Sequence, residues 1–328
     1  MPDLAPSDDP ARELRQLVET GRYREALEAQ RRAPDAVGRR PEVELLAATA
    51  ATRLGELNVG VTLAESALER FRSRADADGR MRAMNLLGAI AFEHGRLDDA
   101  ERCFGEALEQ ANALEDTRMA AHASNNLASV AHLRSQPDLA LSLYRNALLE
   151  YQRLGDRRGI AQTYHNLGLA FRQRRDWDDA EAAALQAVRH AEQVGDETLV
   201  ALAVTGRAET HIERGELELA RQELLRAERI AREAADTVGL AEVRRLGAIL
   251  AFKHGDYQEA LDLALAARDV ARQHGVLQLQ AECAGVAGAA LLRLGRTPEA
   301  ARYRSEGAEL FERLGATRLR EALDRLLA

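Results

Sequence analysis

Asparagines recur in the middle of three successive helical segments, and their side chains are well suited to holding a ligand. Asn85 and Asn125 are 40 residues apart, and so are Asn126 and Asn166. An amide offers two donors and an acceptor, so it can pair with both the N–H and the C=O of an extended peptide. Asn is otherwise a mediocre residue inside a helix. We predict that this row contacts a ligand backbone; the alternative is that the amides are solvated or bridge neighbouring segments.

The same helical segments carry further polar side chains at positions that avoid the packing face. The remaining predicted binding residues are Arg82, His122, Ser129, His132, His165, Arg172, Arg245 and Lys253. The centre of the row is mildly cationic because of Arg82, His122, His132, His165 and Arg172. The following section is acidic because of Glu209, Glu213 and Glu242. An extended ligand with an acidic stretch at one end would match this change of sign. The alternative is that these charges form an ordinary solvated surface.

Catalytic and metal-binding patterns do not emerge from the sequence. His132 and His165 fall on neighbouring segments seven positions out of step, which is about 10 Å along a helix axis. Zinc ligands must converge on one point at bonds of about 2 Å, so this pair does not form a zinc site. His211 falls at a packing position, and Cys103 and Cys283 show no CxxC spacing. HExxH, GxSxG and P-loop motifs are missing. We therefore expect no enzyme activity, no metal and no cofactor.

Composition argues against nucleic acid and membranes as binding partners. The formal net charge is −8, whereas non-specific nucleic-acid binding needs a cationic surplus. The segment MPDLAPSDDPAREL lacks the apolar core of a secretory signal, and no apolar run is long enough to span a bilayer. We expect a cytoplasmic protein that binds neither nucleic acid nor membrane. Ala, Leu, Glu and Arg dominate, which favours an all-α fold.

The elements that would position these side chains form a repeat of 40 residues. Small residues recur at this spacing in the first helix of each unit, and again twice in the second helix. The three series are Ala48, Gly88, Ala128, Gly168, Ala208, Ala248 and Gly288; Gly60, Ala100, Ala140, Ala180, Ala220, Ala260 and Ala300; Ala67, Ala107, Ala147, Ala187, Ala227, Ala267 and Gly307. Small residues allow two helix backbones to approach closely. Glycines between the helices, replaced by Ser135 and Arg175 in two units, would supply the positive φ that ends a helix.

This pattern resembles the tetratricopeptide repeat. The resemblance rests on Leu167-Gly168 and Phe171, followed by Ala180, Ala184 and Ala187, and on their equivalents in other units. Forty-residue units with Leu-Gly-Asp connectors are similar to those of MalT-like bacterial regulators and cell-polarity adaptors, and kinesin light chain has a slightly longer unit. The resemblance implies a right-handed α-solenoid of about eight stacked helical hairpins. The first helices would line its concave groove, and the NNLA and HNLG motifs resemble those of peptide-binding members.

The repeat predicts the organisation of the chain. We expect a flexible N-terminus over 1–9, a short helical hairpin over 10–40 and seven repeat units over 41–316. The predicted units are 41–80, 81–120, 121–160, 161–200, 201–240, 241–280 and 281–316. A capping helix would follow over 317–328, because solenoids must cover their last apolar face.

Three hypotheses for function follow from this organisation. The leading one is a non-catalytic scaffold or adaptor that binds a peptide or protein segment in the groove. The second is a regulatory sensor, in which a signalling peptide or small ligand changes the curvature of the solenoid. The third is self-assembly into a homo-oligomer through the C-terminal helix or the outer face.

Overall fold

The computed structural model describes residues 10–32 and 39–327. Within these ranges the chain is all-α, with 17 helices and no strand. It divides into two compact units, 1–123 and 124–328, and the division falls within helix α8 (Thr117–Leu133). The expected flexible segment 1–9 lies outside the described residues, as does the region 33–38. No helix in the described part of the chain is long and apolar enough to cross a membrane.

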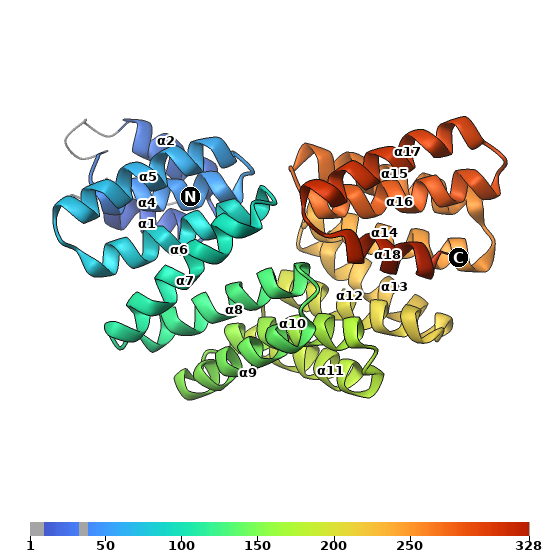
Figure 1. The fold of residues 1–328 in the computed structure, drawn as a ribbon, viewed down its shortest axis with the longest axis horizontal. Helices are drawn as coiled ribbons and strands as arrows, with labels where there is room; N and C mark the ends of the chain where they lie inside the picture. The colour runs from blue at the N-terminus through green and yellow to red at the C-terminus, as the bar shows by residue number, and fades with distance from the viewer. Residues whose placement is uncertain (1–9, 33–38, 328) are drawn as a thin grey trace. The chain divides into compact units, whose positions relative to one another are not determined.

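The first unit consists of successive antiparallel helices that pack on their neighbours (Figure 1). Its helices before α8 are α1 (Pro10–Glu19), α2 (Tyr23–Arg32), α4 (Pro41–Arg53), α5 (Leu57–Ser73), α6 (Ala77–Glu93) and α7 (Leu97–Ala113). The short pair α1 and α2 packs on α4 through Leu14, Ala26 and Leu27, which are buried.

The second unit continues the same alternation to the last helix. Its helices after α8 are α9 (Pro137–Leu154), α10 (Arg157–Arg174), α11 (Trp177–Val194), α12 (Glu197–Arg214), α13 (Leu217–Glu233), α14 (Thr237–His254), α15 (Tyr257–Gln273), α16 (Leu277–Arg293), α17 (Thr297–Arg313) and α18 (Thr317–Leu326). α18 packs on α16 and α17 and buries Leu323 and Leu327.

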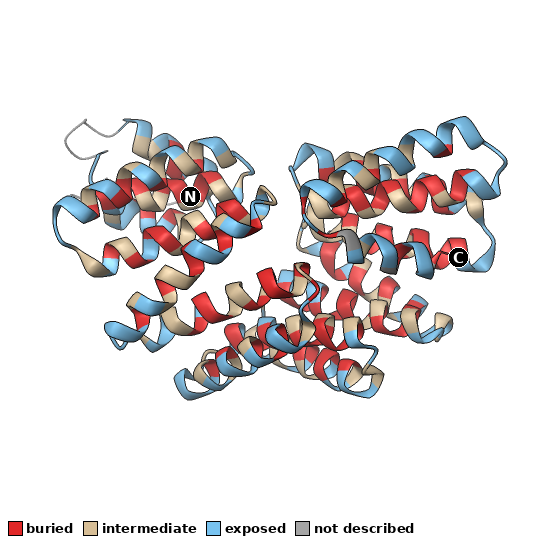
Figure 2. Ribbon diagram, in the orientation of Figure 1, coloured by how far each residue is buried: buried red, intermediate tan, exposed pale blue. Residues whose placement is uncertain are grey.

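Alanine provides much of the core. The alanines that recur every 40 residues in the second helices, from Ala67 to Ala267 and from Ala100 to Ala300, are all fully buried. Figure 2 shows the buried residues as stripes along the helices, with exposed residues concentrated at the turns. The small-residue positions differ in tightness, however. A Cβ atom added to Gly88 would lie 2.7 Å from the Phe104 ring, whereas one added to Gly168 would find its nearest neighbour at 3.8 Å. Only the first of these positions therefore demands glycine.

A residue with a left-handed backbone ends a helix about every 20 residues. Within hairpins this position holds glycine six times, and Ser135 and Arg175 adopt the same conformation with φ of 56° and 64°. Between hairpins it holds glycine four times, while Ala75, Glu115 and Ala235 also have positive φ. In every turn except the one at Gly195, the next N–H donates to the carbonyl five residues earlier, as from Asp156 to Tyr151 at 2.9 Å. The turn geometry is therefore kept even where a side chain makes it costly.

The aspartate that follows the left-handed residue between hairpins begins the next helix. Its carboxylate accepts a hydrogen bond from the backbone N–H three residues ahead, as between Asp156 and Gly159 at 3.0 Å. The residues that share this role are Asp76, Asp116, Asp156, Asp196 and Asp236. The Leu-Gly-Asp connector is thus a helix stop joined to a helix start.

Replacing Ala235 by glycine should stabilise the protein, because glycine adopts positive φ without the steric cost that alanine incurs. Ala235 is exposed with φ of 52°, so Ala235→Gly should raise the free energy of unfolding by about 1 kcal/mol. The neighbouring Ala234 has φ of −77° and serves as the matched control. Ala234→Gly should destabilise by about 0.5–1 kcal/mol. Urea denaturation of both variants checks this; equal effects would contradict it.

Candidate binding face on the first helices

The first helices of successive hairpins form one side of the second unit. α10 packs against α12, α12 against α14 and α14 against α16, whereas no two second helices in the described residues approach as closely. The first helices therefore lie on the inner, concave side of the stack. We call the solvent-facing side of α8, α10, α12, α14 and α16 in the second unit the first-helix face.

An amide pair joins the first two helices of this face. Asn166 on α10 donates through Nδ2 to Oδ1 of Asn125 on α8 at 3.3 Å. The hydroxyl of Thr163, also on α10, donates to the same oxygen at 3.4 Å. Both asparagines remain half-buried. The predicted asparagine row therefore bridges neighbouring repeats at this point, which was the alternative interpretation.

Beside the amide pair lie two imidazoles that carry no charge at neutral pH. Burial, followed by the nearby Arg172 guanidinium, lowers the pKa of His132 and of His165 to about 4 each. The His165 ring lies against the α12 backbone, where a Cβ added to Gly206 would be 2.7 Å from Nδ1. Glycine at position 206 is thus what allows the ring to reach this position. Gly206 could not be singled out by sequence reasoning, because it lies outside the repeating small-residue series.

Two buried polar atoms near His132 lack hydrogen-bond partners among the described residues. They are Nδ1 of His132 and Oε1 of Gln173. The amide nitrogen of Gln173 donates to the His132 carbonyl and to the Ser135 hydroxyl, at 3.3 Å each, so the orientation of Gln173 is fixed. Leaving a buried polar atom unpaired costs about 1–3 kcal/mol. A ligand that donates to and accepts from these atoms would recover that free energy.

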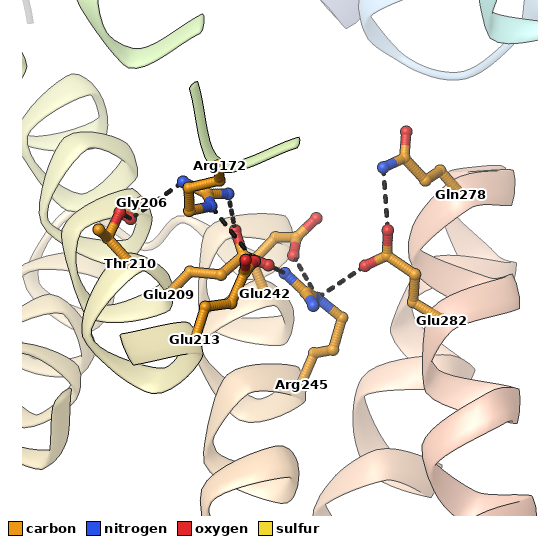
Figure 3. Close-up of polar contacts among 9 residues, drawn as sticks. All are labelled: Arg172, Gly206, Glu209, Thr210, Glu213, Glu242, Arg245, Gln278 and Glu282. Atoms are coloured by element: carbon orange, nitrogen blue, oxygen red, sulfur yellow. Dashed lines mark hydrogen bonds and ion pairs between the residues drawn. The ribbon is translucent and has the colours of Figure 1, made fainter. Parts of the chain in front are cut away.

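Farther along the face, a chain of ion pairs crosses four helices (Figure 3). Arg172 on α10 binds the carboxylates of Glu209 and Glu213 on α12. Arg245 on α14 binds Glu209 at 2.9 Å and Glu242 at 3.0 Å, and its Nε lies 3.0 Å from Glu282 on α16. Gln278 lies at the α16 end of the chain in Figure 3. Both arginine side chains are more than nine-tenths buried.

The expected change of sign along the groove is wrong for the second unit. Arg172 was expected to belong to a cationic centre and Glu209 to a separate acidic section, but the two side chains bind each other. His132 and His165 contribute no charge at neutral pH because burial favours the neutral imidazole. Opposite charges therefore compensate locally, so Arg172 and Arg245 are part of the structure of the face.

The remaining predicted binding residues are placed as follows. Ser129 was expected at a position that avoids the packing face, yet its hydroxyl lies 3.0 Å from the buried Tyr144 hydroxyl and satisfies it. Asn126 is half-buried on α8, and Lys253 is exposed on α14. In the first unit, Asn85 is half-buried and His122 is exposed, while Arg82 forms an ion pair with Asp78 on its own helix.

A cavity lies away from these residues. It has a volume of about 550 Å³ and opens between α16, α17 and α18, where Gly285, Phe311 and Leu323 contribute to its lining. It is framed by the helix that covers the end of the stack.

Glu282 should make stability depend on pH. Burial, reinforced by Glu242 and Glu209 against the opposing Arg245, raises the pKa of Glu282 to about 7. The folded state therefore keeps a proton that the unfolded chain releases near its ordinary pKa, and this stabilisation is lost as the pH rises through about 7. As the pH rises from about 5 to about 8, the free energy of unfolding of Glu282→Gln should increase relative to that of wild type by on the order of 2 kcal/mol. Urea denaturation across that range checks this, and parallel pH profiles for the two proteins would contradict it.

Comparison with known proteins supports this architecture. Models of the tetratricopeptide repeat match residues 80–109, 119–193 and 165–235. A search of curated proteins finds no match. The fold is similar to a Rap protein complexed with Competence and Sporulation Factor, with a TM-score of 0.64 and 13% identity over 93% of this chain and 97% of the other.

Two further solved structures share the fold. The Rap conjugation gene regulator of the plasmid pLS20, in complex with the Phr* peptide, has a TM-score of 0.69 and 16% identity over 84% of this chain and 74% of the other. Aspartyl phosphate phosphatase F from Bacillus subtilis has a TM-score of 0.55 and 12% identity over 94% and 96%. With its 40-residue period, its stacked hairpins and these matches, the chain contains tetratricopeptide repeats over residues 80–109 and 119–235.

Proposed function

We propose that this chain is a non-catalytic scaffold that binds an extended peptide or protein segment on the first-helix face of the second unit. The observation that carries the proposal is the group of polar atoms on α8 and α10. Asn125 and Asn166 hold each other in place, and His132 Nδ1 and Gln173 Oε1 are buried without hydrogen-bond partners in the described part of the chain. A peptide backbone supplies one donor and one acceptor per residue and would pair with such atoms.

The mutual hydrogen bond of the asparagines does not use up their capacity. Each amide has two donor hydrogens and an acceptor oxygen, and the Asn125–Asn166 contact uses one hydrogen and one oxygen. Pre-positioned amides lose little side-chain entropy when a ligand arrives, which favours binding. The similar structures of a Rap protein and of the pLS20 regulator were solved with a peptide or factor bound, which is consistent with such a role.

The peptide proposal can be tested by probing an array of short peptides from the source organism with the purified full chain. The double variant Asn125→Ala, Asn166→Ala should lose most binding, because each hydrogen bond to a ligand contributes about 1 kcal/mol and two side chains are removed. Asn146→Ala, an exposed asparagine on the second helix α9, is the matched control and should bind as wild type. Unchanged peptide binding by a folded double variant would contradict the proposal.

A second candidate is a sensor in which the ligand changes the curvature of the second unit. The ion-pair chain favours it, because Arg172, Glu209 and Arg245 connect three consecutive first helices through side chains alone. A ligand that displaced one of these contacts would alter the spacing of the helices it joins. A ligand shifts such an equilibrium only by its differential affinity for the two spacings.

Small-angle X-ray scattering distinguishes the sensor from the scaffold. With a peptide selected from the array, the sensor predicts a change in the radius of gyration in wild type. The variant Glu209→Gln weakens the connection between α10 and α14 and should reduce that change. An identical radius of gyration with and without saturating peptide would exclude the sensor hypothesis and would be consistent with the scaffold hypothesis.

The other sequence-based hypotheses gain less support. Self-assembly through the C-terminal helix would need an exposed apolar side on α18, but its Leu323 and Leu327 are buried against the same chain. One similar structure is a phosphatase, at 12% identity. That likeness concerns the fold alone, so we retain the non-catalytic scaffold as the proposal.

A further inference from the structure

His211 on α12 interrupts a series of buried apolar residues. The equivalent residues at steps of 40 are all apolar and buried: Ala51, Ala91, Ala131, Phe171, Ala251 and Leu291. His211 is equally buried, with 4% of its side chain exposed. The repeat needs no polar group here, so the imidazole is a specific departure from the packing pattern.

Two carboxylates from neighbouring elements converge on this imidazole. Its Nδ1 lies 2.7 Å from Oε2 of Glu216, at the start of α13, and 3.6 Å from Oε2 of Glu181 on α11. One ligand atom from each of the three residues can be chosen so that all lie within 4.8 Å of one another. A nitrogen and two carboxylate oxygens at such separations are a donor set that suits a divalent transition metal.

Arginines hold the other oxygen of each carboxylate. Arg207 Nη2 lies 3.4 Å from Oε1 of Glu181, and Arg214 Nε lies 2.9 Å from Oε1 of Glu216. These contacts turn both Oε2 atoms towards His211. The Oε2 atom of Glu181 is buried and has no hydrogen-bond partner among the described residues. A buried, unpaired carboxylate oxygen is costly, and a cation between it and the imidazole would remove that cost.

The charges connected to this cluster are also unbalanced, with more carboxylates than guanidiniums. The network of ion pairs that includes the two His211 partners connects five carboxylates with three guanidiniums, an excess of two negative charges before His211 is counted. These residues are Asp178, Glu181, Glu192, Glu216 and Glu223, with Arg207, Arg214 and Arg226. One divalent ion would balance this excess.

We propose that His211, Glu181 and Glu216 form a binding site for a divalent transition metal of the Zn²⁺ type. The metal would take Nδ1 of His211 and one oxygen from each glutamate. The two glutamates are 27% and 32% exposed, so the site opens to solvent on the carboxylate side and leaves a position for water. Bonds of about 2.0–2.2 Å require Glu216 to move slightly away from the imidazole. The bound ion would connect α11, α12 and the start of α13.

The full chain, stripped of metal with a chelator, should bind Zn²⁺ in a titration followed by calorimetry. His211→Leu should lose one saturable site; leucine is the residue at the equivalent Leu291, so the fold should be kept. Glu181→Gln, which preserves shape, should weaken that site by at least about tenfold. Zn²⁺ should raise the melting temperature of wild type and leave that of His211→Leu unchanged, because a ligand stabilises only the state that binds it.

Controls separate this site from other histidines. His254→Leu, an exposed histidine on α14, should bind Zn²⁺ at the site as wild type does. The competing explanation is that His211 only contacts the two carboxylates as hydrogen-bonding and ion-pairing partners. In that case Zn²⁺ would have no effect on stability. The proposal is overturned if wild type shows no saturable Zn²⁺ binding, or if His211→Leu and wild type bind it equally.

Discussion

Each helix pair in the described residues is joined by a turn with one left-handed residue, except where residues 33–38 intervene, and the rest of the structure depends on this turn. It recurs about every 20 residues, so helices α5 to α17 all contain 17 or 18 residues. Equal lengths keep the hairpins in one phase, and buried alanines can then meet at every crossing. The constraint is strong enough that Ala75, Glu115 and Ala235 adopt a conformation that side chains resist.

The repeat and its helices could be predicted from the sequence because both depend on local rules. Small residues at 40-residue spacing and glycines at helix ends are visible without a structure. The sequence also indicated that Ser135 and Arg175 take the place of a glycine, although their positive φ needed the structure. The division into two units within α8 was not predicted, since the repeat runs through it without a change of pattern.

The candidate face was predicted only in part, because side chains do not meet at equal positions of successive repeats. Reading equivalent positions placed Arg172 and Glu209 in separate sections, yet they are 37 residues apart and bind each other. Glu209 and Arg245 are 36 residues apart, again about one helical turn short of the repeat. Alternating charge at this shorter spacing was the signal that could have revealed the ion-pair chain. The Ser129–Tyr144 contact connects a first helix with a second and had no repeating signal.

The first-helix face thus combines two environments that suit different parts of a ligand. Around α8 and α10 the side chains are neutral, partly exposed and not fully paired. From α10 to α16 the charges are buried and compensate one another. Burial opposes ionisation of Glu209, but Arg172 and Arg245 outweigh it and lower the pKa of Glu209 to about 2. Hydrogen bonds to a ligand cost little in the first environment, whereas contacts in the second must displace existing ion pairs.

Hydrogen–deuterium exchange tests the central claim most directly, because it locates binding along the chain. The full chain would be compared alone and with a saturating peptide selected on the immobilised protein. The account predicts slower exchange in α8, α10 and α12, with α9, α11 and α13 unchanged. Protection confined to the second helices, or to the region around α18, would contradict it.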